Sequence, residues 1–579
     1  MLITDPPKVK EIWAEHFERV LNQDSDFDMS VLDELPQWPV NWSLGELPTL
    51  EEVITSIKQL SSGKAPGEDG IPPDIFIHGG PYIAQKVLEL FIQIWQEGEV
   101  VQAFRDANIV HLYKNKGDRS CCDNHRGISL LCIAGKILMR VIANRLGPHT
   151  DRIGLIPESQ CGFRPNRGTC DMSFSVGQLQ EKCRLLHQDL YLLFIDLTKA
   201  FDTINREGLW CILEKAGCPK HFVGIIRSFH DNMKASVRVG GDKSTPFNVT
   251  CGTKQGCVIA PMLFSIFFSM MLHVAFKDST DGVEIKSRCD VGLGNINTNH
   301  FKATSKVTFS TIRDLLFADD CALAACSQET LQQLCDCFSN AARTFGLTIS
   351  IKKTGVLYQP ARGNAYVPPT ILIEGKKLKA VEHFKYLGSL ISNDASVDAE
   401  ITARIAKATA AFGRLTKRLW KNRDIRLNTK ISVYRSVVLT SLLFGCETWT
   451  LKKIHLARLE KFHQTTLRKI AKIKWFHKVT NYEVLSRGKI NRKQSMIEGA
   501  QLRWIGHVTR MSNDRIPKAL LYGRLKNGCS SRGNHNTYLN QVKRTLRGCG
   551  IKPSNLEKLA ANRNRWRAEC RDGVVALLT

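Results

Sequence analysis

The sequence lacks several features that mark common classes of protein. Its first residues, MLITDPPKVKEIW, hold no apolar stretch of the kind found in a secretory signal. Its 19 cysteines are never spaced as C-x-x-C, so we expect neither a disulfide framework nor a zinc site, but reduced thiols of an intracellular protein. Residues 62–67, SGKAPG, lack the further glycine and the hydroxyl residue of a phosphate-binding P-loop. The choice between nucleus and cytoplasm stays open.

Long apolar runs are also scarce. The longest extends from Val258 to Phe276 and has the length of a short membrane helix. However, Ser265, Ser269 and His273 recur at every fourth position, which aligns them on one face of a helix. We therefore expect a buried core helix with one polar stripe, and no membrane partner.

Acidic residues are few in the last third of the chain. Residues 401–579 contain 39 Lys and Arg against 9 Asp and Glu, whereas residues 1–400 contain 42 against 46. The whole net charge of +26 therefore comes from the last third. A polyanion is the natural partner of such a region, and its binding would be sensitive to salt. A solvated basic surface is the alternative.

The pattern of apolar residues predicts alternating helices and strands, followed by a helical region. A helix is expected at 9–21 and another at 49–61, with Thr49 as its cap. Further helices are expected at 83–95, 134–146, 329–345 and, with Asn205 as its cap, at 205–216. Strands are expected at 107–113, 190–197, 235–239, 244–250, 315–317 and 321–325. From about residue 398 the spacing predicts basic amphipathic helices, the second at 454–475.

Two adjacent carboxylates interrupt an apolar run in RDLLFADDCALAA (313–325). Asp319 and Asp320 between two short strands predict a tight hairpin with carboxylates at its tip. Asp196 ends another apolar strand, and three converging carboxylates would repel one another unless cations lay between them. Two magnesium ions about 3.5–4 Å apart would suit phosphoryl transfer. A helix cap at Asp196 and an ordinary turn at 319–320 are the alternative.

Eight ordered segments resemble the reverse transcriptases of non-LTR (LINE-type) retrotransposons. They are SGKAPGEDGIP (62–72), NHRGISLL (124–131), SQCGFRPNRGTCD (159–171), FIDLTKAFDTIN (194–205), KQGCVIAPMLFS (254–265), LLFADDCALAA (315–325), GLTISIKKT (346–354) and FKYLGSLIS (384–392). LFGCETW (443–449), LRWIGHVTRM (502–511) and NRWR (564–567) resemble the region that follows the polymerase in such elements. The resemblance covers nearly the whole chain.

The resemblance implies an α+β fold, with the fingers, palm and thumb of a right-hand polymerase and an antiparallel sheet in the palm. An N-terminal helix and connector would occupy 1–48, the fingers and palm 49–395, and a helical thumb 396–479. A basic, mainly helical region would follow at 480–579. The endonuclease of such elements is expected to be absent.

The resemblance also assigns the chemistry. Asp196, Asp319 and Asp320 would be catalytic ligands of two magnesium ions, for which manganese could substitute. Lys353 would protonate the leaving pyrophosphate, although the neighbouring Lys352 competes for that role.

Five residues are expected to bind the incoming nucleotide. Phe201 would pack beneath its sugar and leave no room for a 2′-hydroxyl, although a core aromatic is the alternative. Gln255 and Gly256 would form the turn that contacts the nucleotide and template. Lys114 and Arg126, on a fingers hairpin, would clamp the triphosphate, with surface charge as the alternative.

A basic face on the first helix of the thumb is expected to contact nucleic acid. Its residues are Arg404, Lys407, Arg414, Lys417, Arg418 and Lys421.

The resemblance therefore predicts an RNA-directed DNA polymerase that adds dNTPs to a primer on an RNA template. Its partners would be the RNA template and the DNA primer and product, and the oligomeric state stays open. One alternative is a catalytically inactive, retroelement-derived protein that only binds nucleic acid. A second is an RNA-dependent RNA polymerase, which Phe201 and the alanine before the Asp pair disfavour.

Overall fold

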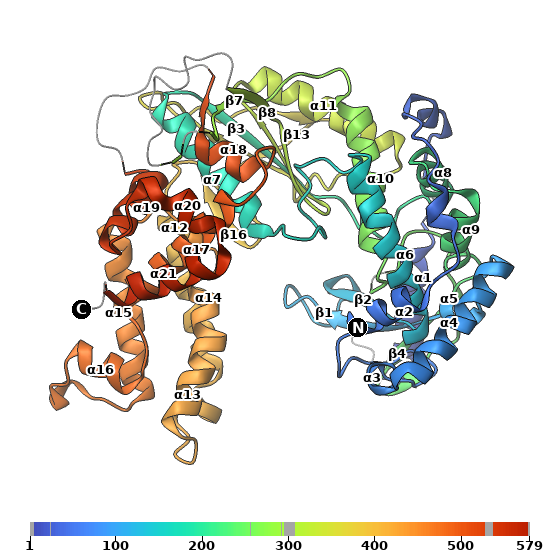
Figure 1. The fold of residues 1–579 in the computed structure, drawn as a ribbon, viewed down its shortest axis with the longest axis horizontal. Helices are drawn as coiled ribbons and strands as arrows, with labels where there is room; N and C mark the ends of the chain where they lie inside the picture. Colours follow the sequence, from blue (N-terminus) through green and yellow to red (C-terminus); the bar gives the residue numbers. More distant parts are fainter. Residues whose placement is uncertain are drawn as a thin grey trace. The chain divides into compact units, whose positions relative to one another are not determined.

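A computed structural model describes residues 5–23, 25–254, 256–290, 292–293, 307–526 and 536–576. The chain divides into two compact units. Unit 1 comprises Met1–Phe163, Asp196–Ser279 and Asp336–Ser350, and unit 2 comprises Arg164–Ile195, Thr280–Cys335 and Ile351–Thr579. Helices and sheets are mixed along the chain, as the α+β prediction requires (Figure 1).

Unit 1 joins one sheet to a set of helices. Its sheet has the order β2-β1-β4-β5, and β6 also pairs with β4. The strands are β1 (Ala107–Tyr113), β2 (His125–Leu130), β4 (Lys234–Val239), β5 (Asp242–Lys243) and β6 (Phe247–Asn248). The helices include α1 (Pro6–Leu21), α2 (Leu50–Lys58), α3 (Pro73–His78), α4 (Gly80–Glu97), α5 (Gln102–Arg105), α6 (Ile133–Arg152), α8 (Arg206–Lys215), α9 (Lys220–Ser228) and α10 (Ala260–Phe276).

Local signals explain where two of these helices begin. At α2, the backbone N–H of Glu52 donates to Thr49 Oγ1 at 3.3 Å, and the Thr49 N–H donates to Glu52 Oε2 at 2.9 Å. This reciprocal capping box satisfies two N–H groups that a helix start leaves free. At α8, the Gly208 N–H donates to Asn205 Oδ1 at 2.9 Å. The predicted caps at Thr49 and Asn205 are confirmed.

One strand prediction holds only in part. Within 244–250 the chain forms only the two-residue strand β6, and β5 lies just before this range. Pro246 lies between them and has no N–H to donate to a neighbouring strand, so the pairing is interrupted there.

The apolar run at 258–276 forms α10, most of whose residues are buried. Ser265 and Ser269 are buried with the apolar residues, and Ser265 Oγ donates to the Pro261 carbonyl at 2.9 Å. His273 is exposed. The predicted core helix is confirmed, and none of the helices in the described ranges combines the length and apolarity needed to cross a membrane.

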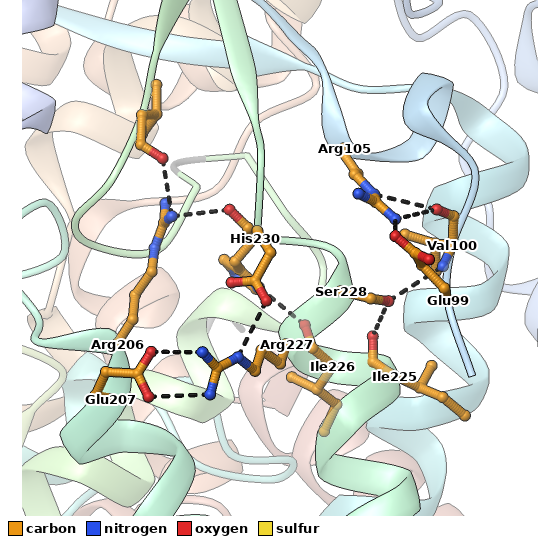
Figure 2. Close-up of polar contacts among 12 residues, drawn as sticks. Glu99, Val100, Arg105, Arg206, Glu207, Ile225, Ile226, Arg227, Ser228 and His230 are labelled. Atoms are coloured by element: carbon orange, nitrogen blue, oxygen red, sulfur yellow. Dashed lines mark hydrogen bonds and ion pairs between the residues drawn. The ribbon is translucent and has the colours of Figure 1, made fainter.

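Polar contacts hold α8 and α9 together (Figure 2). Arg227 pairs with Glu207 at 2.8 Å and with Asp231 at 3.0 Å. Ser228 Oγ donates to the Ile225 carbonyl at 2.8 Å and accepts from the Val100 N–H at 3.2 Å. These contacts tie the end of α9 to the segment that leads into α5.

Unit 2 contains the sheet with order β14-β11-β3-β10-β9. Its strands are β3 (Leu190–Ile195), β9 (Asp314–Phe317), β10 (Asp320–Ala325), β11 (Gly355–Gln359) and β14 (Lys379–Ala380). Within this sheet the β11–β14 pair is parallel and the other pairs are antiparallel. The other strands are β7 (Val283–Ser287), β8 (Thr308–Ile312), β12 (Leu372–Ile373), β13 (Lys376–Lys377), β15 (His383–Tyr386), β16 (Ser389–Ser392) and β17 (Gly523–Leu525), and α11 (Gln328–Thr344) passes from unit 2 into unit 1.

Helices dominate unit 2 after residue 398 (Figure 1). Their side chains form two apolar cores. The first core lies among α12 (Asp398–Arg414), α13 (Leu427–Val433), α14 (Thr440–Leu442), α15 (Lys453–Ile470) and α16 (Asn481–Arg487), with π-helical turns at Thr416–Trp420 and Tyr434–Leu439. The second lies among α7 (Thr169–Leu185), α17 (Lys493–Thr509), α18 (Ile516–Tyr522), α19 (Tyr538–Gly548), α20 (Leu556–Ala561) and α21 (Arg563–Ala576).

The second core joins α7 to the C-terminal helices. Phe174 packs edge-on against Trp504 and Tyr538, at ring distances of 5.6 and 5.1 Å. Beside it, Arg515 and Asp171 form an ion pair at 2.7 Å, with both side chains buried. Helices that are more than 300 residues apart in the sequence therefore share one hydrophobic core.

Candidate active site

The predicted carboxylate hairpin is present in unit 2. Phe317 of β9 pairs with Asp320 of β10, so Ala318 and Asp319 form a two-residue turn. Ala318 has a φ of 58°, a left-handed conformation that is uncommon for a residue other than glycine. Asp319 is half-buried and Asp320 is exposed. The tip of the hairpin thus carries both carboxylates, Asp319 in the turn and Asp320 at the start of β10.

Strand register determines what lies next to this turn. Ile195, the last residue of β3, pairs antiparallel with Cys321 of β10. Asp196 directly follows Ile195, and its carbonyl accepts from the Ser350 N–H at 2.8 Å. On the other side of β3, Phe194 pairs with Gly355 of β11, two residues after Lys353. The end of β3 and the starts of β10 and β11 therefore share one end of the sheet.

Two of the segments predicted to bind nucleotide are hydrogen-bonded to each other in unit 1. The Thr253 N–H donates to the Phe201 carbonyl at 2.8 Å, and the Gly252 N–H donates to the Ile204 carbonyl at 3.0 Å. Gln255 lies outside the described residues. Gly256 has a φ of 106°, and a Cβ there would lie 2.7 Å from the Ser129 carbonyl of β2. Only glycine suits that close approach.

Phe201 has a fixed position. Its ring stacks on Phe264 of α10 at 4.4 Å and lies edge-on to Phe163 at 6.1 Å. The side chain is only half-buried, so part of the ring is accessible. The stacking on Phe264 is what the core-aromatic alternative predicts, and the accessible part of the ring is what contact with a sugar would require.

Lys114 and Arg126 lie on the hairpin formed by β1 and β2. Arg126 pairs with Leu112 and is exposed. Lys114 follows β1, and its Nζ donates to the Asp123 carbonyl at 2.8 Å. The hairpin predicted for these two residues is confirmed.

Comparison with known proteins relates part of this chain to a family. Residues 113–391, just under half of the chain, match the family described as reverse transcriptase (RNA-dependent DNA polymerase). This part of the chain is therefore similar to a reverse transcriptase domain. It contains Asp196, the 318–319 turn, Phe201 and the β2 strand, and the resemblance to non-LTR retrotransposon enzymes is confirmed.

The proteins that this chain resembles are named as RNA-directed DNA polymerases of mobile elements. The enzyme from mobile element jockey of Drosophila melanogaster is 25% identical over 437 residues, 75% of this chain and 45% of that protein. Its counterpart in Drosophila funebris is 25% identical over 487 residues, 82% of this chain and 50% of that protein. The probable enzyme from transposon X-element of Drosophila melanogaster is 24% identical over 355 residues, 61% and 36% of the two chains. The chain thus spans about half the length of the first two relatives.

Two solved structures are similar to this chain at lower sequence identity. Apo telomerase from Candida tropicalis is 15% identical, with a TM-score of 0.32 over 54% of this chain and 59% of that one. The RNA-dependent RNA polymerase of a human picobirnavirus is 11% identical, with a TM-score of 0.43 over 80% and 75%.

Reverse transcriptases use divalent metal ions. Asp196, Asp319 and Asp320 offer carboxylate oxygens, the ligand type that magnesium prefers. Throughout the described part of the chain, however, no three His, Cys, Asp or Glu side chains lie close enough together to hold a metal ion. The donor chemistry of the three aspartates fits such an ion, whereas their side chains are not gathered around a single point.

Two basic residues near the nucleotide-binding segments were not predicted. Arg206 donates to the carbonyls of His230 and Val249 at 2.8 and 2.9 Å, and to those of Cys251 and Gly252 at 3.2 and 3.0 Å. It thereby fixes the segment that leads to Gly256. Lys254 is buried, and burial lowers its pKa to about 7. The sequence signals near these two residues were the helix cap at Asn205 and the KQG motif at 254–256. Neither signal shows that the neighbouring basic side chain is buried.

The basic face predicted on α12 needs one correction. Arg404 is only 5% exposed, and its guanidinium pairs with Glu400 at 2.6 Å and donates to the Gly388 carbonyl at 2.6 Å. Its guanidinium carbon also lies 4.5 Å from the centre of the Phe444 ring. Placing Arg404 on the exposed face was therefore wrong, because Gly388 and Phe444 cover that side of the helix. The exposed members are Lys407, Arg414, Lys417, Arg418 and Lys421.

Proposed function

We propose that this protein is an RNA-directed DNA polymerase that adds dNTPs to a primer on an RNA template. The observation that carries the proposal is the register between β3 and β10. Because Ile195 pairs with Cys321, Asp196 and the Asp319–Asp320 turn extend from adjacent strands at one end of a sheet. The family match at residues 113–391 supports the same chemistry.

In this proposal the three aspartates would hold two magnesium ions, which manganese could replace. When bound, the ions supply charge neutralisation at the reacting phosphate. Asp319 is the firmest candidate on the hairpin because it is half-buried, whereas Asp320 is exposed. Lys353, exposed in the turn before β11, donates a proton to the leaving pyrophosphate in this scheme, and Lys352 is its competitor.

The nucleotide would be held by residues of unit 1. Arg126 and Lys114 would contact its phosphates. The turn at Gln255 and Gly256 would contact the nucleotide and the template. Support comes from the hydrogen bonds between the segment before Gly256 and the Phe201 backbone. The RNA template and the DNA primer and product would complete the complex.

We also propose the right-hand division of the chain into fingers and palm at 49–395, thumb at 396–479 and a basic region at 480–579, after an N-terminal segment at 1–48. The two cores after residue 398 support two separate parts of this region, although the first core also includes α16, which lies beyond residue 479. Lys407, Arg414, Lys417, Arg418 and Lys421 would contact the nucleic-acid backbone.

Primer extension on an RNA template with dNTPs and magnesium tests this function. Wild type should extend the primer, and Asp319→Ala should reduce the rate by roughly a thousandfold or more, because charge stabilisation of the transition state is lost. Asp424→Ala, which removes an exposed aspartate of the same unit, is the matched control. No extension by wild type, or equal extension by Asp319→Ala, would exclude the proposal. Salt-sensitive RNA binding without any extension would favour the inactive alternative.

Phe201 separates DNA synthesis from RNA synthesis. If its ring excludes the 2′-hydroxyl, Phe201→Ala should raise the use of ribonucleotides relative to deoxynucleotides by roughly tenfold or more. Phe201→Tyr keeps the ring and should keep the preference. The measurement is the ratio of kcat/KM values for matched dNTP and NTP pairs. An unchanged ratio in Phe201→Ala would leave Phe201 as a packing residue on Phe264.

A further inference from the structure

The loop between α15 and α16 and the first turn of α16 contain three exposed aromatic residues. The label of α16 is at the lower left of Figure 1. Trp475 is 89% exposed, Phe476 is 57% exposed and Tyr482 is 71% exposed. Large aromatic side chains are normally buried, since they contribute most of their stabilisation there. Rings left open to solvent in this way indicate a surface that another molecule covers. Residues 472–482 are called the aromatic-basic loop below.

The loop has a defined backbone. Trp475–His477 forms a 3₁₀ turn in which the Lys474 N–H donates to His477 Nδ1 at 3.2 Å. Arg468 of α15 donates to the Val479 carbonyl and to Asn481 Oδ1, both at 2.9 Å. The Thr480 N–H donates to Glu483 Oε2 at 2.8 Å in a capping box that starts α16. The turn therefore presents Trp475 and Phe476 on a framework anchored at both ends.

The charge around the rings is mainly positive. Lys472, Lys474 and Lys478 of the loop are exposed. Lys469, Arg487 and Lys489 are exposed in the adjoining residues. Glu483 is the nearest acidic residue in the sequence, and its carboxylate already accepts the hydrogen bonds of the capping box. An anionic partner is therefore complementary to the loop.

The two neighbouring rings are nearly perpendicular. The centres of Trp475 and Phe476 are 5.9 Å apart, with an angle of 80° between the ring planes. Each ring can accordingly stack on a different base, as unpaired bases allow and a closed duplex does not. Lysines on either side would meet the phosphates between those bases.

We propose that the aromatic-basic loop binds single-stranded nucleic acid, with bases stacked on Trp475 and Phe476 and phosphates on Lys472, Lys474 and Lys478. The loop lies outside residues 113–391, so it adds a contact beyond the polymerase domain. The inference rests on the proposed function only in taking nucleic acid as the partner. A strand held there would be template or displaced product, and either is single-stranded.

Fluorescence anisotropy with the full chain tests the loop. The probes are a labelled 20-nucleotide RNA, a DNA of the same sequence, and the duplex of the two. Trp475→Ala with Phe476→Ala should weaken binding of both single strands by roughly tenfold or more, because each stacked base contributes about that factor. Duplex binding should change much less. Trp42→Ala is the matched control, since Trp42 is 75% exposed in unit 1.

The lysines are tested by salt dependence. Lys472→Gln, Lys474→Gln and Lys478→Gln together should lower the magnitude of the slope of log affinity against log salt by about 2 for a single strand. Lys376→Gln with Lys377→Gln, on the exposed strand β13, should leave the slope unchanged. All these side chains are exposed, and unchanged thermal midpoints would show that the variants fold.

Several results would overturn the proposal. One is unchanged single-strand affinity in the aromatic double variant, and another is an equal loss for single strand and duplex. A third is a loss of binding to phosphatidylserine vesicles, or of self-association, without any loss of single-strand binding. Asp319→Ala separates the two hypotheses, because it should abolish extension and leave single-strand binding intact. Loop-dependent binding without extension by wild type would support the loop and exclude the polymerase function.

Discussion

Lys493, the first residue of α17, is an amine that the fold buries completely. Its side chain is 0% exposed, and its Nζ lies 3.1 Å from the weak acceptor Met496 Sδ. Burial lowers the pKa of Lys493 to about 7, opposed by the negative charge of Glu460. In the unfolded chain the amine keeps its ordinary pKa of about 10.4. Below pH 7 the folded protein therefore carries a poorly solvated charge at a site that most proteins fill with an apolar side chain.

Replacing Lys493 with methionine should stabilise the protein, and the gain should depend on pH. Between pH 7 and pH 10 this amine is protonated in the unfolded chain and neutral in the folded one, so its own contribution to wild-type stability rises with pH across this window. The gain from Lys493→Met should thus be largest at pH 6, about 2 kcal/mol or more in unfolding free energy, and smaller at pH 9. Urea denaturation midpoints at the two pH values measure it.

The control for Lys493→Met is a lysine that is exposed to solvent in the folded protein. Lys461→Met, at an exposed position of α15, should change neither midpoint in a pH-dependent way. If Lys493→Met destabilised the protein at pH 6, the buried amine would be making a favourable interaction that outweighs its desolvation.

Residue identity alone predicted much of the candidate site. The Ala-Asp-Asp hairpin and the capped helix after Phe201 depend on neighbours in the sequence, and both are present. Arg206 and Lys254 could not be recognised because their roles depend on distant carbonyls. Arg206 donates to the carbonyls of His230 and of the 249–252 segment, and Lys254 Nζ donates to the Arg105 carbonyl at 2.5 Å.

Among the secondary-structure elements, α17 contains a glycine that packing requires. A Cβ on Gly506 would lie 2.0 Å from Trp566 Nε1, and the indole N–H donates to the Leu502 carbonyl at 2.9 Å. Trp566, on α21, is 1% exposed and has no room to move away. The segments LRWIGHVTRM and NRWR, separate in the sequence, therefore meet in one contact between α17 and α21.

Alanine at two glycines of this helix should have opposite effects. Alanine normally stabilises a helix interior by about 1 kcal/mol relative to glycine. At Gly506 the clash with Trp566 should outweigh that gain and lower the unfolding free energy by about 2–3 kcal/mol. Gly499→Ala is the control, because its Cβ would meet only Arg503 and Val574 at ordinary distances of 3.5 Å, and it should be neutral or stabilising. Thermal midpoints of both variants decide, and equal midpoints would contradict the expected contact.

Elements were predicted well where local rules determine them. The capping box of α2 and the core helix α10 required only their own residues. The predicted strand at 244–250 ignored the interruption by Pro246. The basic face of α12 was assigned from periodicity, which cannot show that Phe444, forty residues further along, covers Arg404. Periodicity identifies a helix, whereas the neighbours of its faces depend on tertiary packing.

Over the whole molecule, charge is divided between the parts of the chain. The net +30 of residues 401–579 follows a first part with a net charge of −4. The division into units does not coincide with this boundary, because unit 2 also contains Arg164–Ile195 and Thr280–Cys335. The sequence revealed the charge asymmetry, but not that α7 shares a core with the C-terminal helices, since that contact joins segments over 300 residues apart.

The charge asymmetry predicts where salt acts on nucleic-acid binding. Glutamine at Lys407, Arg414, Lys417, Arg418 and Lys421, all exposed, should lower the magnitude of the salt slope for a single-stranded RNA by up to about 3.5, at about 0.7 for each phosphate contact. The control set changes five exposed lysines of the first 400 residues to glutamine: Lys58, Lys64, Lys220, Lys376 and Lys377. It removes the same charge and should leave the slope nearly unchanged. Anisotropy titrations from low to physiological salt give both slopes. Equal reductions would mean that net charge alone attracts the polyanion, and that α12 and the turn after it form no distinct binding face.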